Sequence, residues 1–102
     1  MELTAKKERG RMTFFFNGEI DEFRCRTLRG ELDREIAAEA PDEVVFDMGG
    51  VSFVDSTGLG LILGRFKRLD AVGSRLMLRN VPPQVDKVFR ASGVYSVVEK
   101  VK

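Results

Sequence analysis

The stretch SFVDSTGLG, residues 52–60, passes from an apolar segment through a polar triplet to a glycine-rich segment. Asp55, Ser56 and Thr57 all have side-chain oxygens, and one such oxygen is enough to accept hydrogen bonds from the free N–H groups at a helix start. We therefore predict that a strand ends near Val54 and that a helix follows. The triplet is then either an N-cap with two additional polar residues or a hydroxyl presented at a helix end.

The apolar pattern on both sides of this stretch predicts an α/β fold. It predicts strands at 2–8, 12–17, 44–48, 75–79 and 94–101, and helices at 22–40, 58–71 and from Pro82-Pro83 to Ser92. The order is β-β-α-β-α-β-α-β. Helices between strands imply parallel pairing, and the opening hairpin adds an antiparallel edge, so we expect a mixed β-sheet. At 102 residues, we expect one domain over residues 1–102.

Glycines, apolar residues and charged residues predict where the strands end and which helix faces are buried. Residues 18–21 are expected to leave the sheet, and Gly49-Gly50 to interrupt the third strand, before extended residues 51–54. The apolar stripe of the first helix is Cys25, Leu28, Leu32 and Ile36. The stripe of the second is Leu59, Ile62, Leu63, Phe66 and Leu69, with Arg65, Lys67 and Arg68 expected to face solvent.

Three further residues have structural interpretations. Cys25 lies on an apolar stripe, and free thiols are usually buried, so we expect a core position. Asp47 lies in a strand that is apolar on both sides, which favours a hydrogen-bonded structural carboxylate. Phe15 lies between two other phenylalanines and cannot share their face. It is either covered by neighbouring elements or exposed as a partner contact.

The composition argues against several function classes. The formal net charge of +1 lacks the basic excess of a nucleic-acid-binding protein, so we expect no direct nucleic-acid contact. The sequence has no histidine and one cysteine, which disfavours a metal site and excludes an internal disulfide. No segment resembles a signal peptide or a membrane span. We therefore expect a soluble, cytoplasmic protein without membrane contact.

Catalytic motifs fail on their spacing. Residues 58–64 read G-x-G-x-x-x-G, one residue too long for the dinucleotide fingerprint, and there is no G-K-[ST] phosphate loop. Residues 54–58 do not form the G-x-S-x-G nucleophile elbow, and no histidine is present to act as its base. We therefore predict no catalytic residues and expect that the protein is not an enzyme.

A family resemblance rests on three segments. GGVSFVDSTGLGLILGRFKRL, residues 49–69, resembles the phosphorylation-site region of bacterial anti-sigma factor antagonists, which have a D-S-[ST]-G-[LI]-G motif. FNGEID, residues 16–21, is similar to their G-E-[LI]-D segment, and residues 88–99 resemble their last helix and strand. These antagonists belong to the sulfate transporter and anti-sigma antagonist (STAS) domain family.

The resemblance implies a partner switch. In this family the unmodified protein binds an anti-sigma factor that is also an ATP-dependent serine kinase, and so frees a sigma factor. The kinase then phosphorylates the motif serine, which corresponds to Ser56, and a phosphatase restores the protein. Thr57 replaces a second serine found in some members, so either hydroxyl is a candidate acceptor. The nucleotide belongs to the kinase, so no cofactor is expected.

The resemblance also implies a docking surface around the acceptor. Asp21 matches an acidic position that lies near the phosphorylated serine in the family, and Asp55 directly precedes it. With Thr57, Gly58 and Gly60, these residues are the expected partner-binding set. The two glycines lack side chains and would allow another surface to approach the backbone.

Elementary energetics agree with such a switch. A phosphate adds about −1.5 to −2 charges, which the helix dipole favours by about 0.3–1 kcal/mol, while a lost hydroxyl cap costs about 1 kcal/mol. Binding should therefore change while folding does not. Two alternatives stay open. One is a non-switching STAS scaffold or accessory module of a signalling or transporter assembly, in which Ser56 is only a cap. The other is a small hydrolase that uses Ser56 and Asp21.

Overall fold

Five strands pair in sequence order into one mixed sheet, as the computed structural model shows for residues 2–101. The first two strands form an antiparallel hairpin, and the other three strands follow in parallel to the second. This confirms the predicted α/β class, the element order and the antiparallel edge. The elements are β1 (Glu2–Glu8), β2 (Arg11–Ile20), α1 (Glu22–Glu39), β3 (Glu43–Val54), α2 (Ser56–Ala71), β4 (Arg75–Arg79), α3 (Pro83–Ser92), the 3₁₀ helix η1 (Val94–Ser96) and β5 (Glu99–Val101).

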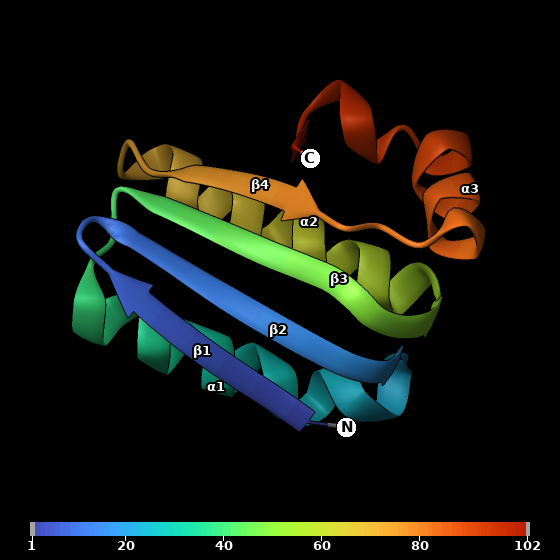
Figure 1. The fold of residues 1–102 in the computed structure, drawn as a ribbon, viewed down its shortest axis with the longest axis horizontal. Helices are drawn as coiled ribbons and strands as arrows, with labels where there is room; N and C mark the ends of the chain where they lie inside the picture. The colour runs from blue at the N-terminus through green and yellow to red at the C-terminus, as the bar shows by residue number, and fades with distance from the viewer. Residues whose placement is uncertain (1, 102) are drawn as a thin grey trace.

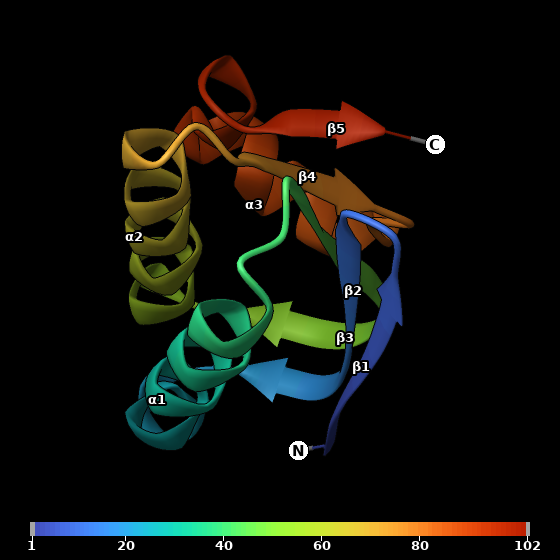
Figure 2. The ribbon, with the colours of Figure 1, turned by 90° about the vertical axis from the view of Figure 1, so that its left-hand side faces the viewer.

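The core lies between the sheet and two helices. Figure 2 shows α1 and α2 side by side on one face of the sheet, and Figure 1 shows α3 beyond the end of β4. Phe14, Phe46 and Leu78 are opposite one another on β2, β3 and β4, and each is fully buried. The predicted stripe of α1 packs against this layer, with Cys25, Leu28 and Leu32 buried and Ile36 partly buried.

The glycines do not end the strands at the expected places. Residues 18–21 were predicted to leave the sheet, yet β2 continues to Ile20, opposite Val54, and only Asp21 lies outside it. Gly49-Gly50 was predicted to interrupt β3, yet the strand runs through them. Both predictions are wrong because the two segments pair with each other, Asn17 with Gly50 and Gly18 with Val51, and small register shifts absorb the irregularity.

The end of the chain is also less regular than predicted. The segment 94–101 was expected to be one strand, but only β5 is extended and η1 precedes it. Val94 and Val98 are both buried, so the apolar pattern reflects core contacts of a turn rather than the alternation of a strand. The Tyr95 hydroxyl donates a 2.6 Å hydrogen bond to Asp86, which fixes this turn to α3.

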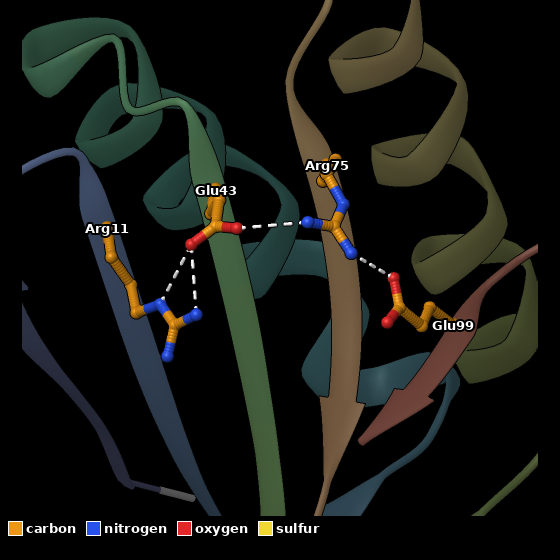
Figure 3. A network of polar contacts seen from close by, with 4 residues as sticks. All are labelled: Arg11, Glu43, Arg75 and Glu99. Atoms are coloured by element: carbon orange, nitrogen blue, oxygen red, sulfur yellow. Dashed lines mark hydrogen bonds and ion pairs between the residues drawn. The ribbon is translucent and has the colours of Figure 1, made fainter.

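The second face of the sheet has no helix over it within residues 2–101 (Figure 2). Instead, charged side chains alternate in sign across four strands, as Figure 3 shows. Arg11 donates from Nε and Nη2 to Oε1 of Glu43, at 3.1 and 2.9 Å. Arg75 bridges Glu43, at 3.1 Å, and Glu99. Two positions after Arg11, Glu43 and Arg75 on their strands, the side chains on this face are buried: Thr13, Val45 and Met77.

Asp47 and Phe15 also lie on this second face. Asp47 accepts hydrogen bonds from the Gly49 N–H at 2.9 Å, Arg79 Nε at 3.1 Å and Asn80 Nδ2 at 2.9 Å, which confirms the structural interpretation. Phe15 is 36% exposed, and the Arg79 guanidinium lies 5.9 Å from its ring centroid. Phe15 is therefore only partly covered, by an arginine side chain.

Candidate functional site

Two helix N-termini meet at one end of the sheet. Ile20 and Val54, the last residues of β2 and β3, are partners in parallel strands, so α1 and α2 begin next to each other. Asp21 and Asp55 are the residues between strand and helix, and each is the N-cap of its helix. The sequence-predicted residues Asp21, Asp55 and Ser56 are thus brought together by parallel strand pairing.

The carboxylates of Asp21 and Asp55 each cap their own helix, and Asp55 also bonds the other helix. Oδ1 of Asp21 accepts from the N–H of Arg24 at 2.9 Å, and Oδ1 of Asp55 accepts from the N–H of Gly58 at 2.8 Å. The second oxygen of Asp55 reaches across to the other helix and accepts from the N–H of Glu22 at 3.0 Å. Asp55 therefore caps α2 and also binds the first turn of α1.

Ser56 is left free by this arrangement. It is the first residue of α2, its side chain is exposed, and it has no side-chain hydrogen bond to any residue within 2–101. The helix begins at Ser56 and not at Gly58 as predicted, because Asp55 supplies the cap. The three residues of the polar triplet thus differ in role: Asp55 is the cap, Ser56 presents its hydroxyl, and Thr57 is half-buried behind it.

Gly58 and Gly60 differ in their surroundings. A Cβ on Gly58 would lie 2.4 Å from the carbonyl oxygen of Ile20 and 2.8 Å from Cγ1 of Val54, so this glycine allows α2 to pack against the strand ends. Gly58 is buried, and internal packing accounts for it. Gly60 is exposed, and a Cβ there would have no atom within 4 Å. Of the two, Gly60 is the one that presents bare backbone outward.

Two exposed aromatic residues near this end were not singled out from the sequence. Phe23, in the first turn of α1, is 73% exposed, and Phe53, near the end of β3, is 49% exposed. Phe23 lies next to Glu22, whose N–H binds Asp55. The position of Phe23 in the helix could have identified it as exposed, because it falls outside the buried stripe of α1 that begins at Cys25. An apolar residue outside the stripe of an amphipathic helix is exposed.

The buried Cys25 lies one turn into α1, behind the two caps. Burial raises the pKa of its thiol, and the negative charges of Asp55 and Asp21 raise it further, against the opposing effect of Arg29. The thiol is 2% exposed and belongs to the core, as predicted. Within residues 2–101, no group of three or more potential metal ligands comes together.

One predicted surface residue is buried. Arg65 was expected on a solvated face of α2, but it is 5% exposed, and its Nε lies 3.2 Å from Oδ1 of Asp33 on α1. Burial lowers the pKa of Arg65, and the charge of Asp33 opposes this change. The prediction is wrong because a long side chain near the α1–α2 contact can reach a carboxylate on the other helix. Lys67 and Arg68 are exposed as expected.

None of the helices described between residues 2 and 101 combines the length and apolar character that crossing a bilayer requires.

The family model of the STAS domain matches residues 2–102. A curated relative, the anti-sigma F factor antagonist of Lysinibacillus sphaericus, is 36% identical over 77 residues, which are 76% of this chain and 66% of that protein.

Two solved structures cover nearly the whole chain. The anti-sigma factor antagonist SpoIIAA in its unphosphorylated form has a TM-score of 0.83 and 29% identity, covering 99% of this chain and 89% of that one. The phosphorylated form of the Bacillus cell fate determinant SpoIIAA has a TM-score of 0.75 and 28% identity, covering 99% and 92%. These relatives are named as antagonists of anti-sigma factors, a regulatory role that agrees with the expectation that this chain is not an enzyme.

Proposed function

Because the chain belongs to the STAS domain family, we propose that it is an anti-sigma factor antagonist controlled by phosphorylation of Ser56. Its unmodified form binds an anti-sigma factor that is also a serine kinase, and a sigma factor is released. The kinase transfers phosphate to the Ser56 hydroxyl, and the phosphoprotein no longer binds. A phosphatase acting on phosphorylated Ser56 restores the active form. The chain itself needs no cofactor, since the nucleotide is the kinase's substrate.

One observation supports this proposal most strongly. The Ser56 hydroxyl is exposed and unbonded within residues 2–101, while Asp55 makes the capping bonds that a serine makes at an ordinary helix start. Modification of Ser56 therefore removes no hydrogen bond made by its own side chain within residues 2–101. Asp55 supplies the cap that the scaffold alternative assigned to Ser56, which supports the switch over that alternative.

The charges around Ser56 explain why binding, and not folding, responds. A phosphate brings about −1.5 to −2 charges to the start of a helix, where the dipole favours it by about 0.3–1 kcal/mol. The neighbouring carboxylates of Asp21 and Asp55 repel it and offset this gain. A partner surface fitted to a neutral hydroxyl has to desolvate the added charge, which costs several kcal/mol.

Phosphotransfer tests the acceptor directly. The anti-sigma factor kinase is first isolated from the source cell with the unmodified chain as bait, then incubated with the chain and ATP. Peptide mass spectrometry should place one phosphate on Ser56. The Ser56→Ala variant should accept none, and the matched Thr57→Ala variant should be phosphorylated normally. Phosphate on Thr57, or none on residues 55–57, would contradict the proposal.

Binding tests the switch separately. Ser56→Asp should weaken binding to the kinase by at least about tenfold, because each tenfold loss corresponds to only about 1.4 kcal/mol. Its free energy of unfolding should stay within about 1 kcal/mol of the parent value. Substitutions at the proposed docking residues should weaken binding even when Ser56 is unmodified; these residues are Asp21, Asp55, Thr57 and Gly60. A substitution of Gly58 also disturbs packing, so its effect on binding has to be compared with its effect on stability. Unchanged affinity of Ser56→Asp would favour the scaffold alternative.

A further inference from the structure

The carboxylate of Asp55 joins two helices that have no covalent link at this end. One oxygen caps α2 through the Gly58 N–H at 2.8 Å, and the other accepts from the Glu22 N–H of α1 at 3.0 Å. Arg24, by contrast, donates its N–H to Asp21, so α1 has a cap of its own. The bond to Glu22 is therefore additional to what either helix needs in order to begin.

The residues that directly follow the two bonded positions are both exposed. Ser56 directly follows Asp55, and Phe23 directly follows Glu22, with 73% of its surface exposed. The bond from Glu22 to Asp55 is itself exposed to solvent. The pairing of Ile20 with Val54 and the bond from the Asp55 N–H to the Ile20 carbonyl set the two helix starts side by side, and the solvent-accessible bond from Glu22 to Asp55 adds a direct link from α2 to the first turn of α1.

We propose that Asp55 is a positioning residue that transmits the charge on Ser56 to the first turn of α1. This inference rests on the proposed phosphorylation of Ser56. A phosphate there competes with Asp55 for the N–H groups of the first turns and repels its carboxylate. The cap on Gly58 keeps Asp55 in place on α2, so the bond that yields is the one to Glu22. The Asp21 cap still holds α1, but the backbone at Glu22 and Phe23 is then less firmly held, and docking weakens at a second location.

Amide exchange with water tests this step without a kinase. Phosphoserine is encoded at position 56 during synthesis, and the exchange rates of ¹⁵N-labelled protein are compared with those of the unmodified chain. Exchange near neutral pH is catalysed by hydroxide, which a nearby anion repels, so added charge alone slows exchange. Loss of the hydrogen bond speeds it. We expect the Glu22 amide to exchange about three- to tenfold faster, as for the loss of one ordinary hydrogen bond.

The internal reference is Arg24, whose N–H binds Asp21 and not Asp55. Its exchange rate should change by less than about twofold. If the Glu22 amide exchanges at an unchanged or slower rate in the phosphoserine protein, the proposal is overturned. Because the phosphoserine is installed directly, this result is independent of whether the kinase chooses Ser56, which the mass spectrometry above decides.

A substitution that separates the two bonds completes the test. In Asp55→Ser, the hydroxyl oxygen can still cap α2, since serine is a favoured N-cap, but the second carboxylate oxygen, which accepts from Glu22, is absent. Glu22 exchange should already be fast in this variant, and phosphoserine at position 56 should accelerate it no further. A protected Gly58 amide shows that α2 is still capped. If phosphoserine accelerates Glu22 exchange by the same factor in Asp55→Ser as in the parent chain, the effect does not pass through Asp55 and the proposal is overturned.

Discussion

An aspartate links α1 to α2 at each of two places, and the two links differ in kind. At the helix starts, Asp55 bonds the backbone N–H of Glu22 in an exposed position. Farther along, Asp33 pairs with the buried Arg65 at 3.2 Å and with Arg68 at 3.2 Å. The buried ion pair is costly to separate, because either charge alone would remain desolvated. The exposed link can exchange its partner for water. The region that is easy to rearrange is the one next to Ser56.

Gly58→Ala should have the largest effect, because it disturbs the packing that brings the helix starts together. The added Cβ would lie 2.4 Å from the Ile20 carbonyl oxygen, which is backbone and cannot rotate away. We expect a loss of about 3 kcal/mol or more in the free energy of unfolding, measured by urea denaturation. The matched Gly60→Ala variant enters open space in a helix and should gain about 0.5–1 kcal/mol. Equal effects of the two variants would contradict this account.

Arg65→Ala tests the buried link. Among residues 2–101, it leaves Asp33 with only the exposed Arg68 as an ion-pair partner, and it removes a side chain that is 5% exposed. We expect a loss of about 3 kcal/mol in the free energy of unfolding, typical of breaking a buried pair. Arg68→Ala is the control, and it should cost less than about 0.5 kcal/mol because its side chain is exposed. A small effect of Arg65→Ala would remove the distinction between the two links.

Asp55→Ala tests the exposed link and the division of roles in the polar triplet. Loss of the α2 cap and of the bond to Glu22 should lower the free energy of unfolding by about 1–2 kcal/mol. Ser56→Ala should change it by less than about 0.5 kcal/mol, since the Ser56 side chain makes no described hydrogen bond within residues 2–101. If thermal and urea unfolding instead rank Ser56→Ala as the more damaging, then Ser56 has the capping role.

Cys25 gives the smallest effect, one that depends on pH. Burial and the charges of Asp55 and Asp21 raise the pKa of its thiol, so the folded state retains the proton when the unfolded state loses it. The stabilisation is complete below the unfolded pKa of about 8.5 and is lost as the pH rises above it. The free energy of unfolding should fall there by at most about 1.4 kcal/mol per pH unit. Urea titrations of Cys25→Ala should show a shallower decline.

The sequence predicted the features that depend on local periodicity. The apolar stripe of α1, the hairpin turn and the helix start after Val54 follow from patterns within a few residues, and the predicted order of elements is observed. The stripe of α2 was predicted in part: Ile62 and Leu69 are buried, but the buried Leu61 was not included in it. Long-range partners were not predictable in the same way. The sequence around Gly49-Gly50 is typical of a strand end, but pairing with β2 keeps this segment in the sheet. Arg65 has the sequence position of a surface residue, but Asp33 of α1 pairs with it in a buried position.

The candidate site was predicted in part for the same reason. The polar triplet indicates a helix start, but it does not decide which oxygen bonds which N–H. That choice depends on the neighbouring helix, because Asp55 also reaches Glu22. The exposure of Ser56 therefore follows from the tertiary structure, as does the burial of Gly58 against Ile20. Whether these residues contact a partner stays a prediction.

The row of charged side chains in Figure 3 favours the observed strand order over alternative orders. Positive and negative side chains alternate from β2 to β5 as Arg11, Glu43, Arg75 and Glu99. Exchanging β3 with β4, or inserting the equivalent strand of another copy, would place like charges beside one another. The row thus discriminates against misassembled sheets during folding, on the face where no helix within residues 2–101 is available to enforce the arrangement.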